Sequence, residues 1–348
     1  MTKQEKIKNF DANSVGDVNA NVFGLPFTTA ESECVLIPIP WEVTVSYGGG
    51  TIDGPEQIFD ASFQVDLYDP IVKDAWKLGI SMDDMDDSLR AKSETYRPVA
   101  EMIIERQCNG EKSEEISEIK DVTKACEEMN AWVKKRSLHF LKQNKTVGLI
   151  GGDHSTPLGM MQALAEHVGE FAILQIDAHA DLRIAYEGFE YSHASIMYNA
   201  LKIKEVKTLV QVGIRDYCEA ENTIIATSKG RVKTFFDKDI KHAQYSGKSI
   251  KKIHEDIVKA LPNKVFISFD IDGLDPKLCP NTGTPVSGGF ETEEVLHLLE
   301  LVVASGKTII GFDLNEVAPG NDEYDANVAA RILYRMINIL AKSNGLKV

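Results

Sequence analysis

Two short motifs contain the residue types from which a metal site could be built. The acids and the imidazole of DAHAD alternate along the chain, as do the two acids that open the DIDGLDP segment. Side chains two residues apart in an extended chain point to the same side, so the members of each motif should converge. A histidine in GGDHS adds a second imidazole. The candidate metal ligands are His154, Asp177, His179, Asp181, Asp270 and Asp272.

This set of ligands favours two metal ions over one. Four carboxylates and two imidazoles are too many donors for a single tetrahedral zinc, and no thiolate is among them. Two hard or borderline ions that share carboxylates fit better, with Mn²⁺ the leading expectation and Ni²⁺, Co²⁺ or Fe²⁺ as alternatives. Several carboxylates held together without cations would be costly. A pair of such ions can make water nucleophilic near neutral pH, which points to hydrolysis.

The motifs follow apolar runs that read as strands. Most of these runs precede a segment with a helical pattern, and this alternation predicts a parallel sheet covered on both faces. Ligands in such sheets bind beyond the carboxyl ends of the strands, which is where the motifs lie. The expected strands are 34–39, 147–150, 171–176, 208–213, 264–269 and 307–312, and the expected helices include 56–61, 113–143, 158–167, 250–261 and 292–305.

The organisation predicted from these elements is one three-layer α/β domain over residues 31–348, preceded by a polar N-terminal arm, residues 1–30. Residues 81–121 contain the acid cluster DDMDD and are expected to form a surface excursion with broken helix. The 348 residues include 53 acidic and 38 basic ones, a net charge of −15 without a basic stripe, so nucleic acid is not expected as a partner.

No apolar run is long enough to span a membrane, and the polar start of the chain is unlike a secretory signal. The five cysteines are scattered and never form a C-x-x-C pair, so we expect no disulfide framework. These features favour a cytoplasmic protein.

The order of the motifs resembles that of the ureohydrolase (arginase/agmatinase) superfamily. GGDHS, DAHAD and SFDIDGLDP are followed by GTPVSGG and EVAP, and the resemblance runs from about Cys34 to the end of the chain. It implies a single α/β/α domain with a mostly parallel eight-stranded sheet. It also implies assembly into a homo-oligomer, a trimer or a hexamer.

The resemblance also implies roles for individual residues. One metal would be held by His154, Asp177, Asp181 and Asp270, and the other by Asp177, His179, Asp270 and Asp272. Asp177 and Asp270 would bridge them, and Asp181 counts with the catalytic residues as well. Glu316 would orient the guanidinium of the substrate through charge-assisted bonds. His193, in YSHAS, would be the histidine that shuttles protons to the departing amine.

The substrate is a small guanidino compound by this resemblance, and agmatine, giving putrescine and urea, is the leading expectation. Arginases have an asparagine two residues beyond DAHxD, where this chain has Arg183. Arg183 would repel the ammonium of agmatine if it faced the pocket, so guanidine, other guanidino acids or amines and formiminoglutamate stay open. Trp41, Thr44 and Tyr47, in the loop after the first strand, could shorten the pocket or instead pack at a subunit contact.

Other functional classes fit the sequence less well. A metallophosphoesterase would need an Asn-His segment and further histidines, which we do not find, and the deacetylase relatives of the same fold use one zinc. A non-enzymatic regulatory homologue should have lost ligands. Here all six ligands are present together with His193 and Glu316. The sequence therefore favours an enzyme.

Overall fold

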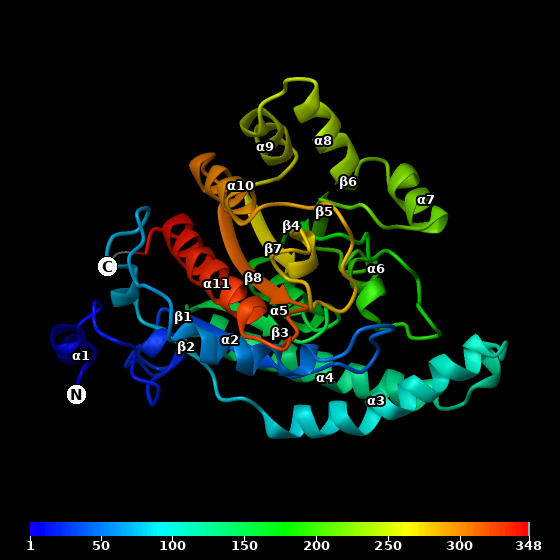
Figure 1. The fold of residues 1–348 in the computed structure, drawn as a ribbon, viewed down its shortest axis with the longest axis horizontal. Coiled ribbons are helices and arrows are strands. Elements are labelled where there is room, and N and C mark those ends of the chain that lie inside the picture. Colours follow the sequence, from blue (N-terminus) through cyan, green and yellow to red (C-terminus); the bar gives the residue numbers. More distant parts are fainter. Residues whose placement is uncertain (347–348) are drawn as a thin grey trace.

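The computed structural model describes residues 1–346, and its centre is an eight-stranded sheet with the strand order β2-β1-β3-β8-β7-β4-β5-β6 (Figure 1). Neighbouring strands pair in parallel throughout. The strands are β1 Cys34–Ile39, β2 Ile80–Met82, β3 Thr146–Gly151, β4 Phe171–Ile176, β5 Val206–Val212, β6 Val232–Phe235, β7 Lys264–Asp270 and β8 Thr308–Asn315.

Helices connect the strands and cover the sheet. The helices are α1 Lys3–Asn9, α2 Gly54–Ser62, α3 Asp87–Cys108, α4 Ile119–Leu141, α5 Leu158–Val168, α6 Ile196–Ala200, α7 Glu219–Thr227, α8 Asp237–Tyr245, α9 Ile250–Lys259, α10 Thr292–Ala304 and α11 Tyr324–Ser343. The predicted α/β fold is confirmed, and the sheet is parallel in full rather than mostly.

Alternate residues of the central strands face two different cores. On β4, Ala172 and Leu174 pack in one cluster together with α2, α9, α10 and α11. Phe171 and Ile173 pack in the other, with α4, α5 and α6. Because β4 is buried on both faces, its sequence FAILQI is apolar except for Gln175. The sheet is therefore the middle of three layers.

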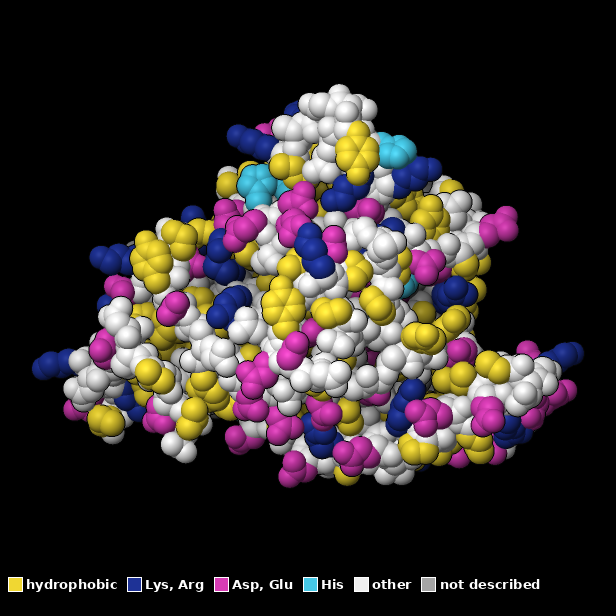
Figure 2. All heavy atoms as spheres, in the orientation of Figure 1, with side chains coloured by type: hydrophobic (Ala, Val, Ile, Leu, Met, Phe, Trp, Pro, Cys, Tyr) yellow, Lys and Arg dark blue, Asp and Glu magenta, His cyan; other side chains and the backbone are white. Residues whose placement is uncertain are grey.

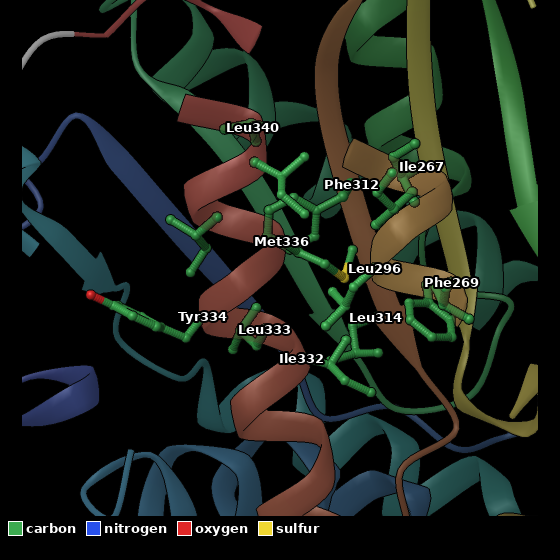
Figure 3. Packing of buried hydrophobic residues seen from close by; sticks show 14 of the residues in the cluster. Ile267, Phe269, Leu296, Phe312, Leu314, Ile332, Leu333, Tyr334, Met336 and Leu340 are labelled. Atoms are coloured by element: carbon green, nitrogen blue, oxygen red, sulfur yellow. The ribbon is translucent and has the colours of Figure 1, made fainter. Parts of the chain in front are cut away.

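Helix α11 closes one of these layers and brings the end of the chain against the middle of the sheet. Leu333, Met336 and Leu340 follow each other at helical spacing and point toward Phe312 of β8 (Figure 3). The helix also reaches the N-terminal segment, since the rings of Phe23 and Tyr334 lie 5.1 Å apart. Residues 22–25 and Phe27, in the predicted arm, are buried in the same core.

The expectation for residues 81–121 is wrong. The segment contains the continuous 22-residue helix α3, which runs alongside α4 and extends beyond the sheet (Figure 1). Pro98 does not break α3, because it is exposed and water can satisfy the carbonyl that loses its hydrogen bond. Helix α4 begins at Ile119 rather than at 113, after a turn in which Arg106 binds both Glu111 and Glu118.

The surface carries the excess negative charge of the chain. Acidic side chains gather along the lower edge of the face in Figure 2, over α2 and α3, with basic side chains interspersed. Within residues 1–346, no helix has the length and apolar character needed to cross a lipid bilayer.

Candidate metal centre and active site

The strands that precede the sequence motifs are neighbours in the sheet. The order β3-β8-β7-β4 places the ends of these four strands side by side, although they are far apart in the chain. GGDHS follows β3, DAHAD follows β4, and DID begins at the last residue of β7. EVAP follows β8. The six candidate ligands therefore lie at one edge of the sheet, as the sequence predicts.

The first group of ligands surrounds the ring of His154. Its Nδ1 lies 3.1 Å from Asp177 Oδ2, 3.1 Å from Asp181 Oδ2 and 3.2 Å from Asp270 Oδ2. All four side chains are buried, yet Nδ1 has no hydrogen-bond partner among the described residues. Ligand atoms of His154, Asp177 and Asp270 lie within 4.8 Å of one another, a donor set that suits a divalent cation, and Asp181 adds a third carboxylate beside the same nitrogen.

The second group shares Asp177 with the first. His179 Nδ1 lies 2.9 Å from Asp272 Oδ2 and 3.7 Å from Asp177 Oδ1. The buried Asp272 Oδ2 has no hydrogen-bond partner within residues 1–346, while Oδ1 accepts from the Ala178 backbone N–H at 3.0 Å. One oxygen of Asp177 thus faces each group, an arrangement that suits a carboxylate bridging two ions.

Buried neighbours orient these ligands. His154 Nε2 lies 2.9 Å from Ser268 Oγ, and that hydroxyl donates to Asp313 Oδ1 at 3.1 Å. A histidine that is fixed through one ring nitrogen presents the other in a defined direction, which is the usual arrangement around metal-binding imidazoles. Sequence reasoning missed Ser268 and Asp313 as supporting residues.

The carboxylates repel one another where they are crowded. Burial and the charge of Asp177 raise the pKa of Asp181 to about 7. Burial, Asp272 and Asp177 raise the pKa of Asp270 well above its usual range. Burial opposes the charged form of His154, but the adjacent carboxylates of Asp177, Asp181 and Asp270 raise its pKa well above the ordinary value. Divalent cations would relieve this repulsion, so the residues present fit a metal pair.

Two site residues have backbone conformations that are rare for side chains other than glycine. Asp181 has a φ of 53° and Glu316 a φ of 64°. The neighbouring backbone holds both: the Asp181 carbonyl accepts from the Met197 N–H at 3.1 Å, and the Glu316 N–H donates to the Gly152 carbonyl at 2.8 Å. Such strain persists only where surrounding contacts fix it, and it is common at functional sites.

Glu316 is a buried carboxylate between the loops that follow β3 and β7. Its Oε1 accepts from the His154 backbone N–H at 2.8 Å. A Cβ added at Gly283 would lie 3.5 Å from its Oε2, so the glycine leaves space beside that oxygen. Burial and the charge of Asp153 raise the pKa of Glu316 well above its usual range. A cation next to Oε2 would stabilise the ionised form.

His193 stands at the wall of the adjacent pocket, at the start of the 3₁₀ turn His193–Ser195. Its Nδ1 lies 3.3 Å from Ser192 Oγ, and its ring meets that of Tyr186 edge to face at 6.3 Å. Burial and the positive charge of His179 lower the pKa of His193 to about 4. The imidazole is therefore neutral at pH 7.

The pocket is a cleft of about 350 Å³ that reaches His179 and Asp181 at its floor. Arg183 lines it, with its guanidinium 4.7 Å above the ring of Tyr186 and its Nε 3.9 Å from Glu221 Oε2. Arg183 therefore lies at the pocket, and the buried carboxylate of Glu221 faces its charge.

Of the three residues of the loop after β1 that the sequence singles out, only Tyr47 lines the mouth of the pocket. Trp41 and Thr44 are fully buried and are not among the residues that line the pocket. Ser46 and the exposed Tyr47 line it instead. Sequence reasoning also missed Asp216, Tyr217 and Glu221, although they follow a predicted strand just as the metal motifs do.

Comparison with known proteins identifies the family. A model of the arginase family matches residues 32–338. The chain belongs to the arginase family. Among curated relatives, an N(1)-aminopropylagmatine ureohydrolase of Thermus thermophilus is 31% identical over 315 residues, which are 89% of this chain and 90% of the relative. An agmatinase of Cronobacter sakazakii is 31% identical over 222 residues, 63% of this chain and 67% of that protein.

Solved structures agree with the fold of this family member. The agmatine ureohydrolase of Thermoplasma volcanium has a TM-score of 0.69 at 21% identity, covering 99% of this chain and 100% of that one. An arginase of Bacillus subtilis has a TM-score of 0.62 at 19% identity, covering 87% and 98%. The predicted family, its ureohydrolase class of enzyme and the arginase-like fold are confirmed.

Proposed function

We propose that this arginase-family protein is a two-metal ureohydrolase that cleaves a guanidino C–N bond and releases urea, with agmatine as the leading substrate. The observation that carries the proposal is the shared carboxylate of Asp177, whose two oxygens face two separate groups of ligands. A hydrolase that uses two ions to attack a resonance-stabilised carbon needs both ions close to the same water.

The proposed ligands are those expected from the resemblance. His154, Asp177, Asp181 and Asp270 would hold one ion, and Asp177, His179, Asp270 and Asp272 the other. When bound, the pair would supply Lewis acidity and make water nucleophilic near neutral pH. Oxygen and imidazole donors without a thiolate favour Mn²⁺, with Ni²⁺ as the second choice.

The protein's own residues would bind the substrate and move protons. The guanidinium would lie against Glu316 Oε2, beside Gly283, where a buried carboxylate lacks a cationic partner. His193 is neutral in the resting site, so it can take up a proton from the attacking water and deliver it to the departing amine. The products would be urea and the amine.

Replacing Glu316 tests the guanidinium contact. Glu316→Gln keeps the shape of the side chain but removes its charge, and we expect kcat/KM for the best guanidino substrate to fall about 10²–10³-fold. Loss of one partner from a buried ion pair costs about 3–5 kcal/mol. Urea release and metal content are measured together. Loss of metal from the variant, or an unchanged kcat/KM, would contradict a direct role in substrate binding.

A second candidate substrate is N(1)-aminopropylagmatine, a longer guanidino amine. Relatives of that name match 89–90% of this chain, whereas the agmatinases match about 63%. The pocket mouth also offers the carboxylates of Asp216 and Glu221 and the rings of Tyr47 and Tyr217 to a cationic tail. These groups support an amine substrate over a guanidino acid.

Arg183 is the residue that argues against an amine tail. In Arg183→Asn we expect kcat/KM for agmatine to rise at least about tenfold relative to that for 4-guanidinobutyrate, because a cation at the pocket is removed. Turnover of agmatine, guanidine, arginine and 4-guanidinobutyrate is compared in both proteins. An unchanged ratio would mean that Glu221 already neutralises Arg183. Arginine as the best substrate of the unaltered protein would overturn our interpretation of position 183.

The deciding experiment for the proposed function is urea release from a panel of substrates. The purified protein is loaded with Mn²⁺, and separately with Ni²⁺, and is offered agmatine, N(1)-aminopropylagmatine, guanidine, 4-guanidinobutyrate and arginine. We expect metal-dependent urea release, fastest with one of the two amines. If guanidine is the only compound that releases urea, with ammonia as the second product, the protein is a guanidine hydrolase. If no compound releases urea, the proposed function is refuted.

We also propose a cytoplasmic homo-oligomer, a trimer or a hexamer. The five cysteines lie apart as free thiols, which supports a reducing compartment. Light scattering of the purified protein tests the assembly, and a monomer at micromolar concentration would contradict it.

A further inference from the structure

Strands β4, β5 and β6 each carry a polar side chain at one level of the sheet, and the row continues to Ser268 of β7 and Asp313 of β8. Gln175 of β4 is the register partner of Gln211 of β5, which is in turn the partner of Thr234 of β6. Both glutamines are fully buried, and Thr234 is half-buried at the sheet edge. Buried glutamines cost free energy unless every polar atom is paired, so their presence in a row calls for a physical reason.

The three side chains form a directed chain of hydrogen bonds that ends on the shared metal ligand. Thr234 Oγ1 donates to Gln211 Oε1 at 2.8 Å, and Gln211 Nε2 donates to Gln175 Oε1 at 2.7 Å. Gln175 Nε2 then donates to Asp177 Oδ2 at 2.8 Å. Each step is well within the range of a good hydrogen bond.

Backbone carbonyls fix the direction of this chain. The second N–H of Gln211 donates to the Ala180 carbonyl at 2.7 Å, and that of Gln175 donates to the His179 carbonyl at 3.1 Å. A carbonyl only accepts, so neither amide can be turned over without facing oxygen with oxygen. Both glutamine amide groups therefore present their N–H side to the segment 177–181.

That segment contains three of the six proposed metal ligands. Asp177 is held at both oxygens, because Oδ1 accepts from the His179 backbone N–H at 2.6 Å. The Ala180 carbonyl, held by Gln211, directly precedes Asp181, whose backbone is in the left-handed region. The glutamine pair thus binds the segment at the shared ligand and next to the strained one.

We propose that Gln175 and Gln211 are positioning residues that prearrange segment 177–181 for metal binding, with Thr234 orienting Gln211. The proposal rests on the proposed function, since it assumes that the segment binds metal. If the segment were free to move, part of the favourable free energy of metal binding would be spent on ordering it. Partners of this kind typically change metal affinity 10–100-fold when removed. The pair contacts ligands rather than the pocket, so it should set metal affinity more than chemistry.

The test compares metal affinity with folding stability in Gln211→Met and Gln175→Met, which keep side-chain length and lose the amide. The dissociation constant for Mn²⁺ is measured by competition with a chelating dye, and thermal unfolding is followed with and without Mn²⁺. We expect the dissociation constant to rise about 10–100-fold. We also expect kcat at saturating Mn²⁺ to fall by a smaller factor than the affinity for Mn²⁺, because saturating metal refills the site.

A matched control separates positioning from general stability. Ile173→Ala makes a cavity on the same strand and the same face as Gln175, so it should lower the unfolding temperature of the metal-free protein while leaving Mn²⁺ affinity unchanged. Thr234→Val removes only the hydroxyl and should raise the dissociation constant less than Gln211→Met does. Thr234→Ser keeps the hydroxyl, so its dissociation constant for Mn²⁺ should equal that of the unaltered protein. If Gln175→Met does not fold, Gln211→Met and Thr234→Val decide the question.

The outcomes distinguish this inference from the proposed function. An unaltered protein that binds fewer than two Mn²⁺ ions refutes the proposed metal pair itself. An unaltered protein that binds two ions, with Gln211→Met binding them equally well, overturns the positioning role alone. The positioning role is also overturned if Ile173→Ala weakens Mn²⁺ binding as much as Gln211→Met does, because the glutamines would then affect binding only through folding stability.

Discussion

Asp177→Asn is expected to remove both metal ions at once and to reduce urea release to background. Each oxygen of Asp177 faces one of the two ligand groups, so this one substitution alters both groups at once. Asparagine has neither the charge nor the second oxygen, and its amide would face the donating Nε2 of Gln175 or the N–H of His179. Loss of a buried charge partner costs about 3–5 kcal/mol, or roughly 10²–10⁴-fold in the affinity for each ion.

Elemental analysis of the purified proteins measures this directly. We expect two ions per unaltered chain and fewer than about 0.2 in Asp177→Asn after dialysis at micromolar protein, by the same loss of affinity. Asp275→Asn is the matched control: Asp275 also lies in SFDIDGLDP, but its Oδ1 accepts from the Lys277 backbone N–H and it belongs to neither group. It should retain both ions. One zinc per unaltered chain, or full activity after exhaustive chelation, would refute the two-metal site.

The position of the candidate metal ligands in the fold could be predicted because it depends on local sequence. Asp177 and Asp270 stand at the ends of apolar strands, and parallel strands place such ends at one edge of the sheet. The four strands that precede the motifs are neighbours in the sheet, as expected if the motifs meet at one site. The sequence alone does not reveal that β8 lies between β3 and β7, because strand order is decided by contacts between segments far apart in the chain.

The elements that the sequence analysis missed fall into two kinds. Strands β2 and β6 are three and four residues long at the edges of the sheet, too short for a recognisable pattern. Helix α11 is different, since Ala326, Ala329 and Leu333 are buried at helical spacing and the pattern could have been recognised. Helix α3 was not expected as one continuous helix, because few of its residues are buried and its apolar periodicity is weak.

The supporting residues of the site were the least predictable. Gln175 and Gln211 are 36 residues apart, and each looks like an isolated polar residue in a buried strand. Their contact with each other can be recognised only from the strand register, which places them side by side. Likewise, nothing local separates the buried Trp41 from the exposed Tyr47 of the same loop, because burial there depends on the chain that packs beneath it.

The charge state of His193 leads to the second large effect. His193→Ala should lower kcat about 10²–10⁴-fold, the usual loss when a side chain that transfers protons is removed. A neutral imidazole at the pocket wall can accept a proton from water and give it to the amine, whereas alanine can do neither. The ring is in neither group of metal ligands, so two ions per chain should remain.

The control for His193→Ala is His242→Ala, on helix α8 and outside the pocket and the metal groups. It should change kcat less than about twofold, as expected of a substitution away from the reacting atoms. Both variants are assayed for urea release at saturating substrate and for metal content in the same preparations. Equal effects of the two substitutions would refute the proton-transfer role. Loss of metal from His193→Ala would instead mean that the ring supports the metal centre, because the fall in kcat would then follow the missing ions.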